Sequence, residues 1–505
     1  MENKRIAFDN DKYLTQQSDC ILERISKFNG KLYLEFGGKL LHDFHAARVL
    51  PGYDPNVKIR LLQKLKSKLD ILLCIYAGDI EKGRIRGDFG ITYDVDAMKL
   101  IDDLRDNGLD VTAVVVTRFS GQQQALRFKN KLENRGIKVF LHEATRGYPT
   151  DVDLIVSEEG YGRNPCVETS NSLVVVTGPG PGSGKLGTCL THLYHDYKKG
   201  LKSGYAKFET FPIWNLPLKH PVNIAYEAAT ADIMDFNMID PFHLSAYNKT
   251  SVNYNRDVEV FPVVKRILEK ISGGQLMYQS PTDMGVNQAG FAIVDDEAAQ
   301  DAAKQELIRR YFRYHYESVL GVEKKETVER AKLIMEEMGL HAEDRKVVGA
   351  ARKACESRHK KERVDEVICG AAIELRDGNI ITGKSSALMH ASSALVLNTI
   401  KHLAQIPDKI HLLSPNVIEY TKNLKKNILG LKSESLDLEE TLIALSMSSA
   451  TNHTAEFAME KLKELAGCEV HLTHIPTPGD ETGLRRLKVN LTTDANFFSQ
   501  DLFIV

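Results

Sequence analysis

A glycine-rich loop that ends in Gly184-Lys185 is the segment of this sequence best suited to chemistry. It follows the apolar run Leu173–Thr177 and begins Gly178-Pro179-Gly180. A loop with few side chains can turn its backbone N–H groups toward a phosphate, and a lysine ammonium adds positive charge beside it. The pattern predicts a P-loop-like phosphate site made by Gly178, Gly180, Gly182, Ser183, Gly184 and Lys185.

The loop departs from the usual P-loop pattern in two ways. Five residues instead of four separate Gly178 from Gly184, and Leu186 occupies the place of the Ser or Thr that normally offers a hydroxyl to Mg²⁺. The nearest hydroxyl downstream is that of Thr188, which could hold Mg²⁺ together with Asp79 or Glu209. The spacing resembles the loop of the dethiobiotin synthetase and cobyric acid synthase group of P-loop ligases. The alternative is a plain Pro/Gly turn between a strand and a helix.

Charged and polar side chains follow several other apolar runs. In an open parallel sheet, ligands bind beyond the carboxyl ends of the strands, so these positions are candidates for a shared site. Asp79 and Glu209 are candidate catalytic carboxylates that could also hold Mg²⁺, and Arg118 and Ser120 are candidate substrate ligands. The competing interpretation is that each is a solvated loop residue.

Two segments further along the chain could complete the site. The polar stretch 281–287 contributes Asp283 and Asn287 as substrate ligands, unless it is only a connector. Lys384 and Ser385 precede a predicted helix, 387–400, where they would form a second anion site, unless Ser385 or Ser386 is a simple N-cap. His390 would lie one turn into that helix as an acid or base, or as a structural histidine.

Alternating apolar runs and amphipathic stretches before residue 235 predict a doubly wound, mostly parallel α/β sheet. The helices expected there include 97–107 and 122–135. The expected strands are 31–36, 69–76, 111–117, 138–142, 152–156, 173–177 and 205–211.

Long charged helices, expected at 258–271, 297–320, 325–338 and 342–359, suggest a helical domain over 236–365. Strands return in 366–505, which predicts an α+β C-terminal domain. The strands expected there are 366–375, 380–383, 469–475 and 484–491, and the helices 386–404, 414–427, 438–446 and 454–466. The first domain would then be 1–235.

Composition excludes several classes of protein. The 66 basic and 68 acidic residues among 505 leave a net charge of −2, which gives no general attraction to nucleic acid or membrane. No run of 18 apolar residues and no signal peptide is present, so we expect a cytoplasmic protein. No zinc-protease motif occurs, and His471 and His474 lie on a predicted strand where their rings would point to opposite faces. A small-molecule substrate is expected, and a homo-oligomer remains open.

Four longer segments resemble a family of uncharacterised bacterial proteins of about this length, known as a domain of unknown function of the DUF/UPF class. They are TGPGPGSGKL, YAKFETFPIWNLPLKHPVNIAYEAATADI, SPTDMGVN and ITGKSSALMHASSALVLN. The resemblance implies a multidomain α/β protein without an established activity. Some relatives are labelled ATP-dependent peptidases, but the sequence lacks the zinc motif that this label would need.

The function expected from these features is an ATP- or phosphate-binding enzyme, of the kinase or ligase type, that acts on a small polar metabolite. ATP or another phosphate-bearing ligand, with or without magnesium, would be the cofactor. Two alternatives remain. The first is an enzyme or sensor that binds a phosphorylated metabolite without hydrolysing ATP, and the missing hydroxyl after Lys185 favours it. The second is a structural or assembly protein.

Overall fold

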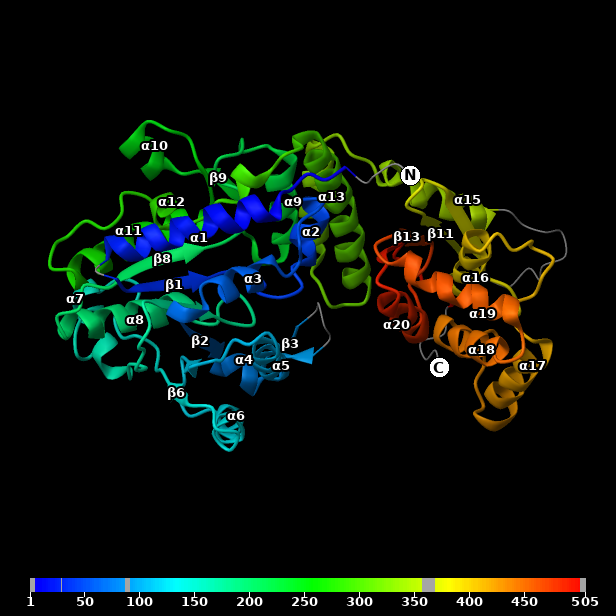
Figure 1. Cartoon of the computed structure of the whole chain (residues 1–505), viewed down its shortest axis with the longest axis horizontal. Coiled ribbons are helices and arrows are strands. Elements are labelled where there is room, and N and C mark those ends of the chain that lie inside the picture. Colours follow the sequence, from blue (N-terminus) through cyan, green and yellow to red (C-terminus); the bar gives the residue numbers. More distant parts are fainter. Residues whose placement is uncertain (1–4, 29, 87–90, 357–367, 500–505) are drawn as a thin grey trace. The chain divides into compact units, whose positions relative to one another are not determined.

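The computed structural model describes residues 5–28, 30–86, 91–356 and 368–499. The chain divides into two compact units, an N-terminal unit, Arg5–Ala303, and a C-terminal unit that begins at Lys304 (Figure 1). The boundary lies inside helix α13 (Asp296–Val319). The three domains expected from the sequence, with boundaries near 235 and 365, stay a prediction.

The N-terminal unit is built on a parallel sheet of six strands in the order β6-β5-β2-β7-β1-β8. The valine-rich strand that precedes the glycine-rich loop, β7, lies at the centre, which explains why all its residues are buried and all but Thr177 are apolar. The strands are β1 (Leu32–Phe36), β2 (Leu69–Tyr76), β5 (Ala113–Thr117), β6 (Val139–Leu141), β7 (Leu173–Thr177) and β8 (Gly204–Phe208).

Helices cover both faces of this sheet. Side chains alternate along each strand, so every strand contributes residues to two hydrophobic cores. Leu72 and Cys74 of β2 pack in one core with α7 (Val152–Ile155), α8 (Lys185–Lys198) and α11 (Asn255–Ile271). Leu73 and Ile75 pack in the opposite core, against α4 (Ala77–Glu81), α5 (Tyr93–Asp106) and α6 (Gln123–Glu133). The predicted α/β class is confirmed for this unit.

One expected strand is wrong. Residues 152–156 form helix α7, because Asp151 caps its first turn by accepting a hydrogen bond from the N–H of Leu154 at 3.0 Å. The remaining elements of the unit are α1 (Asn10–Lys27), α2 (Phe44–Val49), α3 (Val57–Lys64), α9 (Pro221–Ala229), α10 (Pro241–Tyr247), α12 (Pro281–Met284) and two small ladders, β3 (Ile85–Arg86) with β4 (Ile91–Thr92) and β9 (Asn237–Ile239) with β10 (Val252–Tyr254).

The C-terminal unit contains a mixed sheet of four strands in the order β12-β11-β13-β14, with only β13 and β14 parallel. The strands are β11 (Gly370–Glu374), β12 (Ile380–Lys384), β13 (Glu469–Leu472) and β14 (Asn490–Thr493). The helices are α14 (Lys325–Glu337), α15 (Lys346–Glu356), α16 (Ala391–Leu403), α17 (Pro415–Asn423), α18 (Leu438–Ser449), α19 (His453–Glu460) and α20 (Pro478–Arg486).

Two sequence expectations for the C-terminal unit need correction. The expected strand 484–491 begins inside helix α20, and the strand itself runs from Asn490 to Thr493. Thr477 causes this by capping α20, with Pro478 at the first helical position. The helix expected from 387 begins at Ala391, after His390 as its N-cap. None of the helices in the described ranges is long and apolar enough to cross a membrane.

Candidate functional site

The glycine-rich loop 178–185 lies at the switch point of the parallel sheet. The chain leaves β2 toward β5 and leaves β7 toward β8, so the connections after these two neighbouring strands run in opposite directions. Open α/β sheets bind ligands outside the carboxyl ends of their strands at such a point. The fold therefore puts the loop where this architecture accommodates a ligand.

The backbone of the loop is polarised. Its carbonyl groups are held by neighbours: Gly182 accepts a hydrogen bond from the Arg118 guanidinium, and Ser183 accepts one from the Thr117 hydroxyl at 2.7 Å. The loop N–H groups, in contrast, have no acceptor within the described part of the chain. They belong to Gly180, Gly182, Gly184 and Lys185, whereas the Ser183 N–H faces the Gly180 carbonyl across the turn at 181–182. Such a row of unpaired donors at the start of a helix is suited to an anion.

Glycine is required at the end of the loop. Gly184 has a φ of +93°, and a Cβ atom there would lie 2.7 Å from the Thr117 side chain. Gly182, with a φ of +72°, is also left-handed. Between them the Ser183 hydroxyl is buried and has no hydrogen-bond partner in the described structure. The residues predicted from the sequence thus form one continuous loop with two left-handed glycines.

Two cations border the loop. The Lys185 ammonium makes one long contact, 3.5 Å to the carbonyl oxygen of Gly180. The exposed Arg118 guanidinium lies over the Tyr76 ring at 3.5 Å and contacts Gly182. Ser120, also predicted here, is exposed, and its hydroxyl accepts a hydrogen bond from Gln122 instead. Arg118 and Lys185 are therefore the positive charges that the fold brings to the loop.

The candidate magnesium ligands near the loop are differently placed. The Thr188 hydroxyl is buried and accepts a hydrogen bond from the Cys74 thiol at 3.3 Å, so it is not offered to an ion on the loop. Asp79 lies in the first turn of α4, directly after β2, and its carboxylate is 3.4 Å from the Arg84 guanidinium. Within the described ranges, no group of three or more His, Cys, Asp and Glu side chains could hold a metal ion.

Glu209, directly after β8, belongs to a buried cluster of charges. The Lys207 ammonium lies 3.2 Å from Glu209 and also contacts Asp257 of α11. Burial raises the pKa of Glu209 to about 7, against the lowering effect of Lys207. A Cβ atom on Gly37, after β1, would lie 2.6 Å from the Glu209 side chain, so glycine is needed there. Glu209 can therefore exchange a proton near neutral pH.

The structure brings Glu209, Asp283 and Asn287 together around a cavity of about 220 Å³. The Asn287 side-chain oxygen accepts a hydrogen bond from the N–H of Glu209 at 2.8 Å, and Asp283 of α12 accepts one from the Tyr247 hydroxyl at 2.7 Å. The glycine-rich loop and Glu209 follow strands two positions apart, which corresponds to about 10 Å along the sheet edge.

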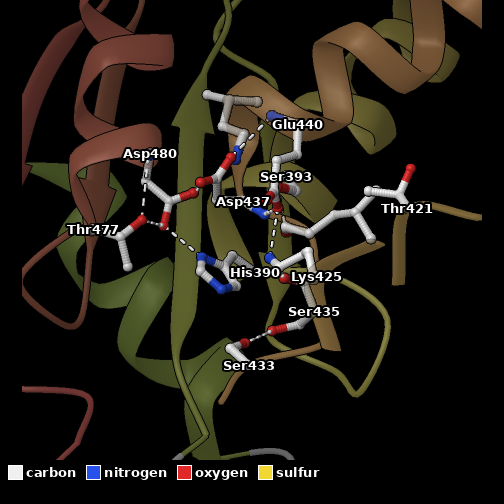
Figure 2. Close-up of polar contacts among 12 residues, drawn as sticks. His390, Ser393, Thr421, Lys425, Ser433, Ser435, Asp437, Glu440, Thr477 and Asp480 are labelled. Atoms are coloured by element: carbon white, nitrogen blue, oxygen red, sulfur yellow. Dashed lines mark hydrogen bonds and ion pairs between the residues drawn. The ribbon is translucent and has the colours of Figure 1, made fainter. Parts of the chain in front are cut away.

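His390 belongs to a separate polar cluster inside the C-terminal unit (Figure 2). Its Nδ1 atom lies 2.7 Å from the Asp480 carboxylate, which also accepts a hydrogen bond from the Thr477 hydroxyl at 2.8 Å. Burial disfavours the charged imidazole, but the bond to Asp480 outweighs it and raises the pKa of His390. A His whose Nδ1 is held by a buried carboxylate has its Nε2 oriented for proton transfer.

Lys384 and Ser385 are placed otherwise than expected. Lys384 ends strand β12, and Ser385 extends the pairing of β12 with β11: its N–H donates to the carbonyl of Cys369 at 2.8 Å, and its hydroxyl accepts from the N–H of Cys369 at 2.9 Å. The helix begins only at Ala391, so the two residues do not lie at its N-terminus. The structural argument for an anion site at Lys384 and Ser385, their position at a helix N-terminus, therefore does not hold.

Several residues of these sites were not foreseen from the sequence. Lys207 and Asp257 were missed because their pairing joins a strand to a helix 50 positions later. Asp480 was missed because it lies in a Pro/Gly-containing stretch that resembles a loop. The Gly37-Gly38 pair directly after an apolar run was an available signal, since glycines at strand ends allow close approach.

A parallel sheet with helices on both faces and a glycine-rich loop at its switch point defines an open α/β protein. The chain belongs to the family of the domain of unknown function DUF1846, whose N-terminal part matches residues 6–339 and whose C-terminal part matches residues 343–503. It is 58% identical to a UPF0371 protein of Clostridium botulinum (strain ATCC 19397 / Type A) over 99% of both chains. A UPF0371 protein of Clostridium tetani is 56% identical over the same share.

Proposed function

We propose that the N-terminal unit is an enzyme that holds a small polar metabolite by a phosphate group on loop 178–185. The observation that supports this most directly is the polarised backbone of the loop. Two of its carbonyl groups are occupied by Arg118 and Thr117, while four N–H groups have no acceptor among the residues that the structure describes. A dianion accepts several such donors at once, which neither water nor a neutral ligand does as well.

Charge adds to this preference. Helix α8 begins at Lys185, so the positive end of its dipole faces the loop, and Lys185 and Arg118 add two full charges. Phosphoryl transfer and related reactions depend on positioning and charge neutralisation. The proton-transferring group of the proposed enzyme is Glu209, on the same edge of the sheet, because its pKa of about 7 suits an acid or base at neutral pH.

The start of helix α8 supports one kind of ligand over the other. A magnesium–ATP complex on a P-loop uses a hydroxyl directly after the loop lysine; here Leu186 takes that place, and the nearest hydroxyl, that of Thr188, is buried and accepts a hydrogen bond from Cys74. This favours a phosphorylated metabolite that is bound without ATP hydrolysis. An ATP-dependent transferase or ligase, with Mg²⁺ held by Asp79, is the second candidate, and the Gly184-Lys185 end of the loop favours it.

Thermal unfolding with a ligand panel tests the proposal. The panel contains inorganic phosphate, glucose 6-phosphate, ribose 5-phosphate, AMP, ADP and ATP, each with and without Mg²⁺. A ligand at a concentration 100 times its dissociation constant stabilises the folded state by about 2.7 kcal/mol. Lys185→Ala should keep the melting temperature of the free protein and lose this stabilisation.

Lys199→Ala is the matched control, because Lys199 is exposed at the other end of α8. It should respond to the ligand as the wild type does. Stabilisation by ATP only in the presence of Mg²⁺ would select the second candidate. Identical responses of wild type and Lys185→Ala to every compound would mean that the loop is only a turn.

A further inference from the structure

The cavity beside Glu209 has a composition of its own, distinct from that of the glycine-rich loop. At about 220 Å³ it is smaller than the ~300–1,000 Å³ of cavities that bind drug-sized ligands, so it fits a single small ring or short chain. Its lining includes Lys207 and Glu209 from β8 and the residues after it, Asp257 from α11, and Asp283 from α12. All of these belong to the N-terminal unit.

The charges of the lining disfavour an anion. Lys207 is already shared between Glu209 and Asp257, and burial lowers its pKa less than these two carboxylates raise it. Asp283 adds a third carboxylate, and Arg24 donates its hydrogen bonds to the carbonyl oxygens of Asp283 and Gly285. His243, also in the lining, is held between the Ser280 hydroxyl and Asp283. A phosphate here would meet three acidic groups and no uncommitted cation.

The charges of the lining do not favour a strongly cationic ligand either. Burial raises the pKa of Glu209 to about 7, so this side chain carries less than a full negative charge at neutral pH. Lys207 also lies in the lining, where it repels a second cation. The balance of charge therefore points to a neutral ligand.

The hydrogen-bonding groups of the lining suit hydroxyl groups. A hydroxyl both donates and accepts, and the cavity offers carboxylate acceptors together with the amide of Asn287. The Asn287 oxygen accepts from the N–H of Glu209, so its NH₂ group, which has no recorded partner in the described chain, is left to donate. The Trp214 indole is fixed by donating to the carbonyl of Asn287 at 2.9 Å, and its ring supplies an apolar wall.

We propose that this cavity is a binding site for a neutral polyhydroxylated molecule of monosaccharide size, a sugar or cyclic polyol. Glu209, Asp257 and Asp283 accept hydrogen bonds from its hydroxyl groups, the Asn287 amide donates one, and Trp214 packs against its carbon skeleton. The site does not depend on phosphate binding at loop 178–185.

Trp214 makes a direct test possible, because it is the only tryptophan of the chain. Its fluorescence emission is followed while D-glucose, D-ribose or myo-inositol is added to the full-length protein up to 100 mM. The expected result is a saturable change with at least one of the three. Putrescine and inorganic phosphate serve as the cationic and anionic probes, and neither should produce the change.

Glu209→Gln keeps the size of the side chain and removes its charge, so binding of the polyol should weaken about five- to tenfold. Asp283→Asn, at another position of the lining, gives a second test of the same prediction. Glu168→Gln, an exposed position, is the control and should bind as the wild type does. The melting temperature of each variant verifies that it is folded.

Lys185→Ala separates this proposal from the proposed function, because it should bind the polyol unchanged even if the glycine-rich loop binds nothing. The proposal is overturned if no polyol gives a saturable change. It is also overturned if putrescine or phosphate gives the change in place of the polyols, or if Glu209→Gln and Asp283→Asn both bind with wild-type affinity.

Discussion

The Asp480 carboxylate is fully buried and lies 2.7 Å from Nδ1 of His390. It also accepts hydrogen bonds from the hydroxyls of Ser392 and Thr477 and from the N–H of Leu438. His390 and Ser392 lie at the start of α16, Thr477 is the N-cap of α20, and Leu438 begins α18. One ionised side chain thus ties together three helices of the C-terminal unit.

Asp480→Asn should lower the free energy of unfolding of the C-terminal unit by about 2–4 kcal/mol, because it breaks a buried pair and removes a charged acceptor. Denaturant unfolding of the full chain measures this. Asp408→Asn, at an exposed position, is the control. A loss no larger than that of the control would show that the cluster does not stabilise the unit.

The same pair predicts how this loss depends on pH. Burial opposes ionisation of Asp480, but the bonds from His390 and its other donors lower its pKa, so its contribution is present above about pH 4 and lost as pH falls through the lowered value. The pKa of His390 is raised, so its contribution is present below about pH 6.5 and lost as pH rises through the raised value. The difference between wild type and Asp480→Asn should be largest near pH 5–6 and smaller at pH 9. A difference independent of pH would contradict this.

Gly184→Ala should destabilise the ligand-free protein by roughly 1–3 kcal/mol, because it forces a left-handed φ on alanine and places a methyl group against Thr117. Gly187→Ala, one turn later in α8, is the matched change. No atom lies within 4 Å of a Cβ atom there, so it should stabilise the helix by about 0.5–1 kcal/mol. Equal effects of the two substitutions on the melting temperature would contradict the loop geometry.

Thr188→Val replaces the hydroxyl by a methyl group of similar size. The loss of the hydrogen bond from Cys74 should cost about 1 kcal/mol or less, and affinity for a phosphate ligand of loop 178–185 should not change. Titration calorimetry with and without Mg²⁺ measures this affinity. A loss of affinity confined to the titration with Mg²⁺ would instead make Thr188 a metal ligand.

The free energy of unfolding of Glu209→Gln, relative to that of the wild type, should increase as pH rises from 5 to 8. Burial raises the folded-state pKa of Glu209 from its ordinary value, about 4.3, to about 7, so the folded state favours the protonated form and loses stability as the side chain ionises. The neutral amide avoids this loss, which amounts to roughly 1–3 kcal/mol. Denaturant unfolding at several pH values checks it, with Glu168→Gln as the control. The charged groups that act on Glu209 are Glu35, Lys207, Arg256 and Asp257.

The central part of the fold could be predicted from the sequence, because runs such as Leu69–Tyr76 and Leu173–Thr177 are mostly apolar and rich in β-branched residues and leucine. The strand expected at 152–156 failed because a short apolar run fits a buried helix equally well, and only the capping bond of Asp151 decides between them. The start of α16 failed for a similar reason: polar residues at 382–386 suggested a cap, but they extend a strand.

The candidate site was predictable where it depends on local sequence. The backbone of loop 178–185 is such a case, since glycine spacing alone determines which N–H groups can converge. The Lys207–Glu209–Asp257 cluster and the His390–Asp480 pair were not, because each joins segments far apart in the chain. Strand order was equally hidden, since no local pattern shows that β7 lies between β1 and β2.

That strand order has a consequence for synthesis of the chain on the ribosome. β1 and β2 are made early but do not pair with each other: Leu32 and Leu69 both find their partner in Leu173. β2 can pair with β5 in the meantime, but the edges of β1 and β2 that face β7 stay open until β7 has left the exit tunnel. Long-range pairing of this kind is slow and exposed to aggregation. Translation of the segment between β2 and β7 should thus set the earliest moment at which β1 and β2 can be joined in one sheet, and the glycine-rich loop emerges directly after β7.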